Sequence, residues 1–168
     1  PIKVANAPCQ DVVIQGKALD ASGLDSLPIP ISTPGFDVAP YLTAGNWITK
    51  DPETGVQNMG TYRGCLRGPR RLGVFMAQFT PAGGLAHWHK WRARGERMPC
   101  AVVLGCPPAI AYVGPQKLPQ GVDELAVAGG IAGEPIRVVK AQSVDLLVPA
   151  DSEIVIEGFI DIDELEPE

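Results

Sequence analysis

The stretch that most constrains this chain runs from Trp47 to Arg63 and reads WITKDPETGVQNMGTYR. Its first residues, Ile48 and Thr49, favour a strand. The segment DPETG at 51–55 has the composition of a tight turn, because proline fixes φ and glycine accepts a positive φ. The sequence therefore predicts a hairpin whose second strand covers residues 56–63.

The second strand of this hairpin carries an unusual set of polar groups. Asn58, Thr61 and Arg63 place an amide, a hydroxyl and a guanidinium within six residues. A strand buried on both faces would carry apolar residues at these positions instead. We interpret the hairpin as one wall of a ligand site.

Composition limits the class of protein. A chain of 168 residues with 45% hydrophobic content predicts one domain with a real core. The net charge of −5 argues against a nucleic-acid partner. No apolar run approaches the roughly 20 residues of a membrane span, and no signal peptide opens the sequence. We therefore expect a cytoplasmic protein without membrane insertion, in which the four cysteines are reduced thiols.

The remaining pattern predicts an α+β fold built on a small antiparallel β-barrel. Residues 1–34 are expected to form an extended lead-in, with a short strand at 12–15, and residues 35–168 the barrel domain. Strands are predicted at 72–79, 99–106, 135–141 and 152–160. Helices are predicted at 83–94 and within 118–133, where Gly129 and Gly130 would end the second one.

Two groups of side chains allow both a structural and a functional interpretation. His87 and His89 suggest a metal site, but on a helix residues two apart point to different sides, which favours exposed or capping histidines. Arg67, Arg70 and Arg71 crowd a Gly-Pro loop. They form either a solvated basic turn or a surface that attracts an anionic ligand.

Glu124 lies at the start of the second predicted helix, where an acidic residue suits the helix dipole. Together with Asn58 it could instead supply two oxygen ligands to a hard cation such as Mg²⁺ or Mn²⁺. The sequence alone leaves both possibilities open.

Four segments together resemble the UbiD family of prenylated-FMN decarboxylases. They are WITKDPETGVQNMGTYR, PCAVVLGCPPA, the long stretch from VDELAVAGG to VPADSEIVIEGF, and the final ELEPE. The resemblance begins at about Leu27 and continues to the C-terminus. It implies a split-barrel flavin-binding domain within a larger polypeptide, and reversible non-oxidative decarboxylation of aromatic or α,β-unsaturated acids. It also implies prenylated FMN, made by a flavin prenyltransferase, with a divalent cation (Mn²⁺ or Mg²⁺) on its phosphate and K⁺ nearby.

The resemblance also assigns residues to the cofactor. Asn58 and Glu124 match the metal-ligating Asn and Glu of the family. A third ligand is often His, and that position falls near Gly83 here, so the match fails at this point. The flavin and monovalent-cation sites correspond to the backbone around Met59, Thr61, Gly114 and Gln116.

Two residues match the catalytic groups of the family. Arg63 resembles the arginine that pairs with the substrate carboxylate, and Glu168 the glutamate that donates a proton after CO₂ leaves. Glu168 corresponds to the Glu of the family's P-E-G-P-[FY]-G-[DE] motif, and the sequence ends before the second carboxylate of that motif. We therefore expect the central third of such an enzyme, inactive alone and completed by the remaining UbiD domains or subunits in an oligomer. The alternatives are a non-catalytic flavin- or anion-binding barrel subunit and an unrelated small barrel.

Overall fold

The computed structural model describes residues 1–77, 82–119 and 121–167, which form three β-sheets and three α-helices. The strands are β1 (Ile2–Lys3), β2 (Tyr41–Leu42), β3 (Asn46–Lys50), β4 (Gln57–Thr61), β5 (Arg63–Leu66), β6 (Leu72–Phe75), β7 (Met98–Leu104), β8 (Arg137–Lys140), β9 (Leu147–Pro149) and β10 (Ile154–Ile160). The helices are α1 (Gly83–Ala93), α2 (Pro108–Val113) and α3 (Glu124–Ala132), together with three short 3₁₀ helices at Pro8–Gln10, Gly16–Asp20 and Leu24–Ser26.

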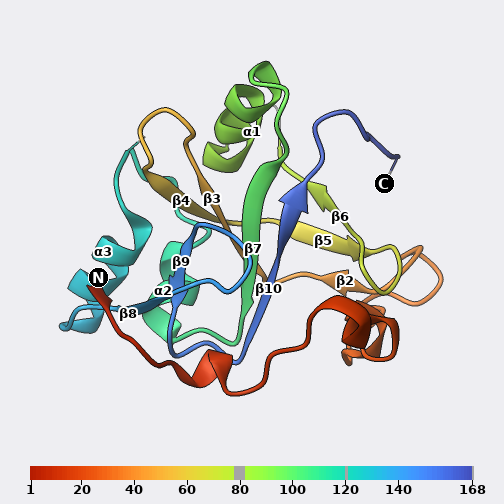
Figure 1. Ribbon diagram of the computed structural model, residues 1–168, viewed down its shortest axis with the longest axis horizontal. Helices are drawn as coiled ribbons and strands as arrows, with labels where there is room; N and C mark the ends of the chain where they lie inside the picture. Colours follow the sequence, from red (N-terminus) through yellow and green to blue (C-terminus); the bar gives the residue numbers. More distant parts are fainter. Residues whose placement is uncertain (78–81, 120, 168) are drawn as a thin grey trace.

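The largest sheet lies in the middle of the molecule, with strand order β10-β7-β3-β4 (Figure 1). The sheet β2-β5-β6 lies on one side of it, and the sheet β1-β8-β9 lies with α2 and α3 on the other. The predicted α+β class is confirmed. The described residues contain ten strands in three separate sheets and no closed barrel, whereas about six strands were predicted. The two-residue strands β1 and β2 are too short to give an alternating pattern in the sequence.

The central sheet is buried on both faces. On β3, Ile48 packs into the cluster that includes residues of α2, α3 and β8, whereas its neighbour Trp47 packs into a second cluster with Leu42 and Val102. Successive side chains of a strand point to opposite faces, so one apolar run serves two cores. This arrangement makes β3 and β7 the fixed frame of the fold.

The predicted hairpin is confirmed, with a correction at its end. β3 and β4 pair in antiparallel register, and Gly55 in the turn has φ of 74°. β4 ends at Thr61, and Arg63 begins β5 in a different sheet. The Tyr62 carbonyl between them accepts a hydrogen bond from the Trp47 indole N–H at 2.9 Å. The polar stretch therefore spans two sheets rather than one strand.

Several other boundaries differ from the predictions. α3 continues through Gly129 and Gly130 and ends at Gly133, whose φ of 77° suits a left-handed cap. β6 covers only 72–75 of the strand predicted at 72–79, and residues 78 and 79 lie outside the described part. The strand predicted at 12–15 is wrong, since this segment has no regular structure and its valines and isoleucine are exposed.

The four cysteines are free thiols, as predicted. No helix in the described residues is both long and apolar enough to cross a bilayer.

The outer edge of the central sheet belongs to β4, because β4 pairs only with β3 among the strands that the structure describes. The N–H groups of alternate residues on an edge strand point away from the sheet and need other partners. On β4 these partners come from α3 and from the end of α2, and the candidate site lies at this edge.

Candidate functional site

A pocket of about 390 Å³ lies along β4, between α1, α2 and α3. Its lining comes from β4 and the start of β5, from the residues around Gly83, from 114–118 after α2, and from Glu124. The pocket therefore joins parts of the chain that are far apart in sequence.

Glu124 is fixed at the bottom of this pocket by the start of α3. Asp123 caps the helix by accepting the Leu125 N–H at 2.9 Å, which places Glu124 as the first helical residue. The Glu124 Oε2 atom accepts the outward N–H of Met59 on β4 at 3.1 Å. Burial raises the pKa of this carboxyl, the Asp123 charge adds to the shift, and the Met59 N–H opposes it. A cation beside Glu124 would favour its charged form.

Asn58 lies beside the first residue of α1. A Cβ atom added to Gly83 would overlap the side-chain oxygen of Asn58, so only glycine fits here with Asn58 in its present position. The Asn58 Nδ2 atom is buried and makes no hydrogen bond of normal geometry among the described residues, although the Asn58 side chain interacts with the Tyr62 phenol and opposes the rise of its pKa. Because a buried amide normally has a partner, this group is a candidate for contact with a ligand.

Tyr62 folds back over β4 and covers the same corner. Its hydroxyl oxygen accepts the Gly84 N–H at 3.1 Å, and a Cβ atom on Gly60 would lie 2.5 Å from that oxygen. Burial raises the pKa of Tyr62, which keeps the phenol neutral. Glycines at 60 and 84 thus provide the space in which a tyrosine joins β4 to α1.

The other end of β4 is joined to the end of α2. The Thr61 N–H donates to the Gly114 carbonyl at 3.2 Å, and the Thr61 hydroxyl donates to Oδ1 of buried Asn46 at 2.9 Å. A Cβ atom on Gly114 would overlap the same Asn46 oxygen. Gln116 follows on the surface, where its side-chain amide donates to the Tyr112 carbonyl at 3.1 Å.

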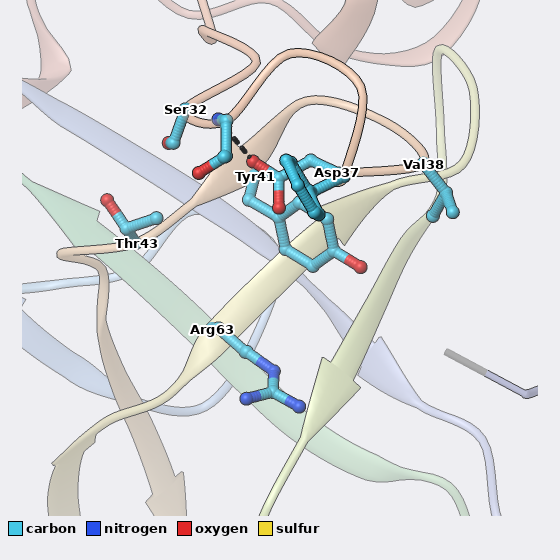
Figure 2. Close-up of a pocket in the computed structure, with 8 residues that line it drawn as sticks. Ser32, Asp37, Val38, Tyr41, Thr43 and Arg63 are labelled. Atoms are coloured by element: carbon cyan, nitrogen blue, oxygen red, sulfur yellow. Dashed lines mark hydrogen bonds between the residues drawn. The ribbon is translucent and has the colours of Figure 1, made fainter.

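Arg63 lies between this pocket and a second, more open hollow of about 520 Å³. The second hollow, which we call the outer hollow, is lined by Arg63 and seven residues from segment 32–43 (Figure 2). Thr33 donates its N–H to Asp37 at 2.6 Å, which closes the loop above Arg63. The guanidinium carbon of Arg63 lies 4.4 Å from the centre of the Phe75 ring.

The residues assigned from the resemblance therefore meet in space. All seven described candidates line the β4 pocket: Asn58, Met59, Thr61, Arg63, Gly114, Gln116 and Glu124. Glu168 lies outside the described residues. The sequence analysis did not find Tyr62, Gly60 and Phe75. Tyr62 and Gly60 belong to the segment WITKDPETGVQNMGTYR, but nothing in its residue spacing indicates that the strand ends at Thr61 between them.

The prediction of exposed or capping histidines is wrong for His87. This residue is buried, and its Nδ1 atom lies 2.9 Å from the Thr49 hydroxyl on β3. Burial lowers the pKa of His87, a change that nearby Lys90 reinforces and Asp51 opposes. His89 is exposed, as predicted. His87 therefore anchors α1 to the central sheet.

The basic loop is matched by acidic groups of the same chain. Arg70 pairs with Asp20 at 2.6 Å, and Arg71 pairs with Glu164 and Glu166, each at 2.6 Å. These contacts agree with the solvated basic turn rather than with a surface for an anionic ligand.

The family model of the UbiD 3-octaprenyl-4-hydroxybenzoate carboxy-lyase Rift-related domain matches residues 2–168. The chain belongs to the UbiD family. Solved UbiD structures agree with this result. The UbiD-class enzyme HmfF from Pelotomaculum thermopropionicum, solved with FMN, matches at 33% identity and a TM-score of 0.84 over 94% of this chain. An evolved dimeric form of HmfF, solved with prFMN, matches at 37% identity and a TM-score of 0.74 over 79% of this chain.

A third similar structure is the apo 3,4-dihydroxybenzoic acid decarboxylase (AroY) of Klebsiella pneumoniae. It matches at 30% identity and a TM-score of 0.79 over 94% of this chain. The matched regions make up 34%, 30% and 33% of the three solved chains. The chain thus spans about a third of the length of these relatives.

The residues of the β4 pocket fit the cation and phosphate that the family implies. Asn58 and Glu124 offer a neutral and an anionic oxygen, which suit a hard cation that keeps positions for phosphate. The Asn58 amide, which lacks a hydrogen bond of normal geometry among the described residues, is consistent with a ligand at this corner. Within the described part of the chain, no group of three His, Cys, Asp or Glu side chains forms a cation site.

Proposed function

We propose that this chain is the cofactor-binding central part of a UbiD-type decarboxylase that acts on an aromatic or α,β-unsaturated carboxylic acid. One observation carries the proposal: seven residues assigned from the family motif line a single pocket. Four of these residues are close in sequence, but Gly114, Gln116 and Glu124 come from a part of the chain more than 50 positions away. The relatives solved with FMN and prFMN support the same cofactor here.

In this proposal Asn58 and Glu124 hold a divalent cation, Mn²⁺ or Mg²⁺, which receives the phosphate of prenylated FMN. The backbone around Met59, Thr61 and Gly114, with Gln116, lines the flavin and a K⁺ site. Buried Glu124 is suited to this role, since a cation would offset the cost of its charge. Prenylated FMN, when bound, supplies an electron sink for cleavage of the C–C bond.

Arg63 orients the substrate carboxylate. Its planar guanidinium can donate two parallel hydrogen bonds to a carboxylate, a geometry that lysine cannot reproduce. The outer hollow, which is lined by Arg63 but not by Glu124, gives an acid a path to Arg63. After CO₂ leaves, the substrate carbon needs a proton, and we assign Glu168 as its donor.

The complete enzyme requires more than this chain. We propose that residues 35–168, preceded by the lead-in 1–34, form a split-barrel domain that works in an oligomer with the remaining UbiD domains or subunits. A flavin prenyltransferase would supply the cofactor. The alternative is a non-catalytic flavin- or anion-binding subunit, which is favoured by Gly83 at the position where the family often has a third ligand.

The first test is cofactor retention. The full chain is co-expressed with a flavin prenyltransferase, supplied with Mn²⁺ and examined by native mass spectrometry and UV–visible absorption. Wild type should carry prenylated FMN and metal, and Glu124→Gln should lose the metal and retain at most about a tenth of the flavin. Glu134→Ala is the matched control, because Glu134 is an exposed acid just after α3. Equal retention in Glu124→Gln and wild type would refute the ligand assignment.

Turnover separates the two candidate functions. With the remaining UbiD parts present, wild type should release CO₂ from an aromatic acid, whereas Arg63→Ala should bind the cofactor and fail to turn over. A complex that keeps its cofactor but releases no CO₂ from any aromatic or unsaturated acid would favour the non-catalytic subunit.

A further inference from the structure

The contact between Arg63 and Phe75 forms the boundary between the β4 pocket and the outer hollow. Arg63 lines both hollows, and Phe75 lines the β4 pocket. The two residues are direct partners in the antiparallel pairing of β5 with β6. The sheet itself therefore places the ring beneath the guanidinium.

The stack constrains an otherwise flexible side chain. An arginine loses about 2 kcal/mol of rotamer freedom when it is fully ordered, so a group that orders it in advance favours ligand binding. A Phe ring attracts the face of the guanidinium and has no polar atom that could accept its N–H groups. Those N–H groups lie in the guanidinium plane and can be directed to a carboxylate.

We propose that Phe75 is a positioning residue, which holds the plane of Arg63 so that its N–H edge receives the carboxylate of an aromatic acid from the outer hollow. The choice of an aromatic acid rests on the proposed function. Phe75 acts through Arg63 and does not itself take part in proton transfer or bond cleavage.

A second stack in the same chain provides a matched control. Arg97 lies 5.1 Å from the centre of the Phe159 ring on β10, and Phe159 is 51% exposed, compared with 45% for Phe75. Phe159 lines neither hollow. Removing this ring takes away the same kind of contact at a similar exposure, but the arginine affected is Arg97 and not Arg63.

The experiment uses the full chain without cofactor, with benzoate as the probe. Benzoate is titrated while NMR follows the side-chain N–H signal of Arg63, which is assigned from its loss in Arg63→Lys. Phe75→Leu should weaken benzoate binding about twofold to fivefold, as expected for an exposed cation–π contact. Phe75→Tyr should restore wild-type affinity, and Phe159→Leu should leave it unchanged. Equal melting temperatures would show that the variants are folded.

Two results would overturn the proposal. One is wild-type affinity in Phe75→Leu, which would mean that the ring does not order Arg63 for a carboxylate. The other is an Arg63 signal in the wild-type chain that does not respond to benzoate at all. Both are independent of cofactor retention, which is measured separately by mass spectrometry. Failure of this inference can therefore be told apart from failure of the proposed function.

Discussion

The two hollows that meet at Arg63 are built in different ways. The β4 pocket is formed by a strand edge and three helix ends, and the groups at its base are buried or tightly packed, as with Glu124 and Gly83. The outer hollow is formed mainly by the loop at 32–43, in which Phe36 is 86% exposed and Val38 is 71% exposed. One hollow is part of the frame of the fold, whereas the other lies on its surface.

Under the proposed function, this difference corresponds to a division of tasks. A cation and a phosphate need fixed ligands, and regular elements fix side chains more closely than loops do. An acid that must enter and leave needs an accessible surface, and loops on a rigid scaffold commonly provide one. Substitutions in the β4 pocket should therefore affect binding strongly, and those in the outer hollow only weakly.

The largest effect is expected from Gly83→Ala. The new Cβ atom would overlap the Asn58 oxygen, and the flexible end of Asn58 would move away. Because Ala is the better helix former by up to about 1 kcal/mol, overall stability should change little. Mn²⁺ affinity, measured from the EPR signal of the free ion, should nevertheless fall by about tenfold or more.

The control for this prediction is Gly130→Ala. Gly130 is a glycine within α3, and a Cβ atom there would meet nothing within 4 Å. This variant should bind Mn²⁺ as wild type does. If Gly83→Ala also kept wild-type affinity, Asn58 would not be a ligand and the β4 pocket would not need its tight packing.

A moderate effect on stability is expected at His87, which anchors α1 to the central sheet. Because burial lowers the pKa of His87, the unfolded chain takes up the proton first as the pH falls below about 6.5. The folded state is therefore favoured above this pH and loses stability below it. His87→Gln should remove this part of the pH dependence and cost about 1–2 kcal/mol at pH 8, through loss of the buried contact with Thr49.

His89→Gln is the matched control, since His89 is exposed on the same helix. Its unfolding free energy, measured in urea from pH 8 to pH 5, should follow that of wild type within about 0.5 kcal/mol. A wild-type pH profile in His87→Gln would mean that another group titrates in this range.

Only part of the fold and of the candidate site was predictable from the sequence. The hairpin was predictable because DPETG has turn chemistry and the motif is local. The candidate cofactor residues were assigned through the resemblance to the family, and the fold places those that are described in one pocket. Their contacts were not predictable, because Met59 and Glu124 are 65 positions apart and meet only through the free edge of β4.

The errors also have physical causes. Arg63 was placed on the second strand of the hairpin, because nothing in the pattern indicates that the chain changes sheets at Tyr62. His87 was expected at the surface, since spacing on a helix cannot tell which side faces a sheet. Its burial depends on the Thr49 hydroxyl, which satisfies the imidazole inside the core.

The smallest effect is expected in the outer hollow. Phe36→Ala removes a ring that is 86% exposed, so the melting temperature and Mn²⁺ affinity should stay at wild-type values. Benzoate binding should weaken by about twofold to threefold, because one edge of the ligand ring loses an aromatic neighbour. Tyr112→Ala, which removes an exposed aromatic ring from α2 outside both hollows, should leave all three quantities unchanged. A large loss of stability in Phe36→Ala would instead make the loop part of the packed frame, and the contrast between the two hollows would then fail.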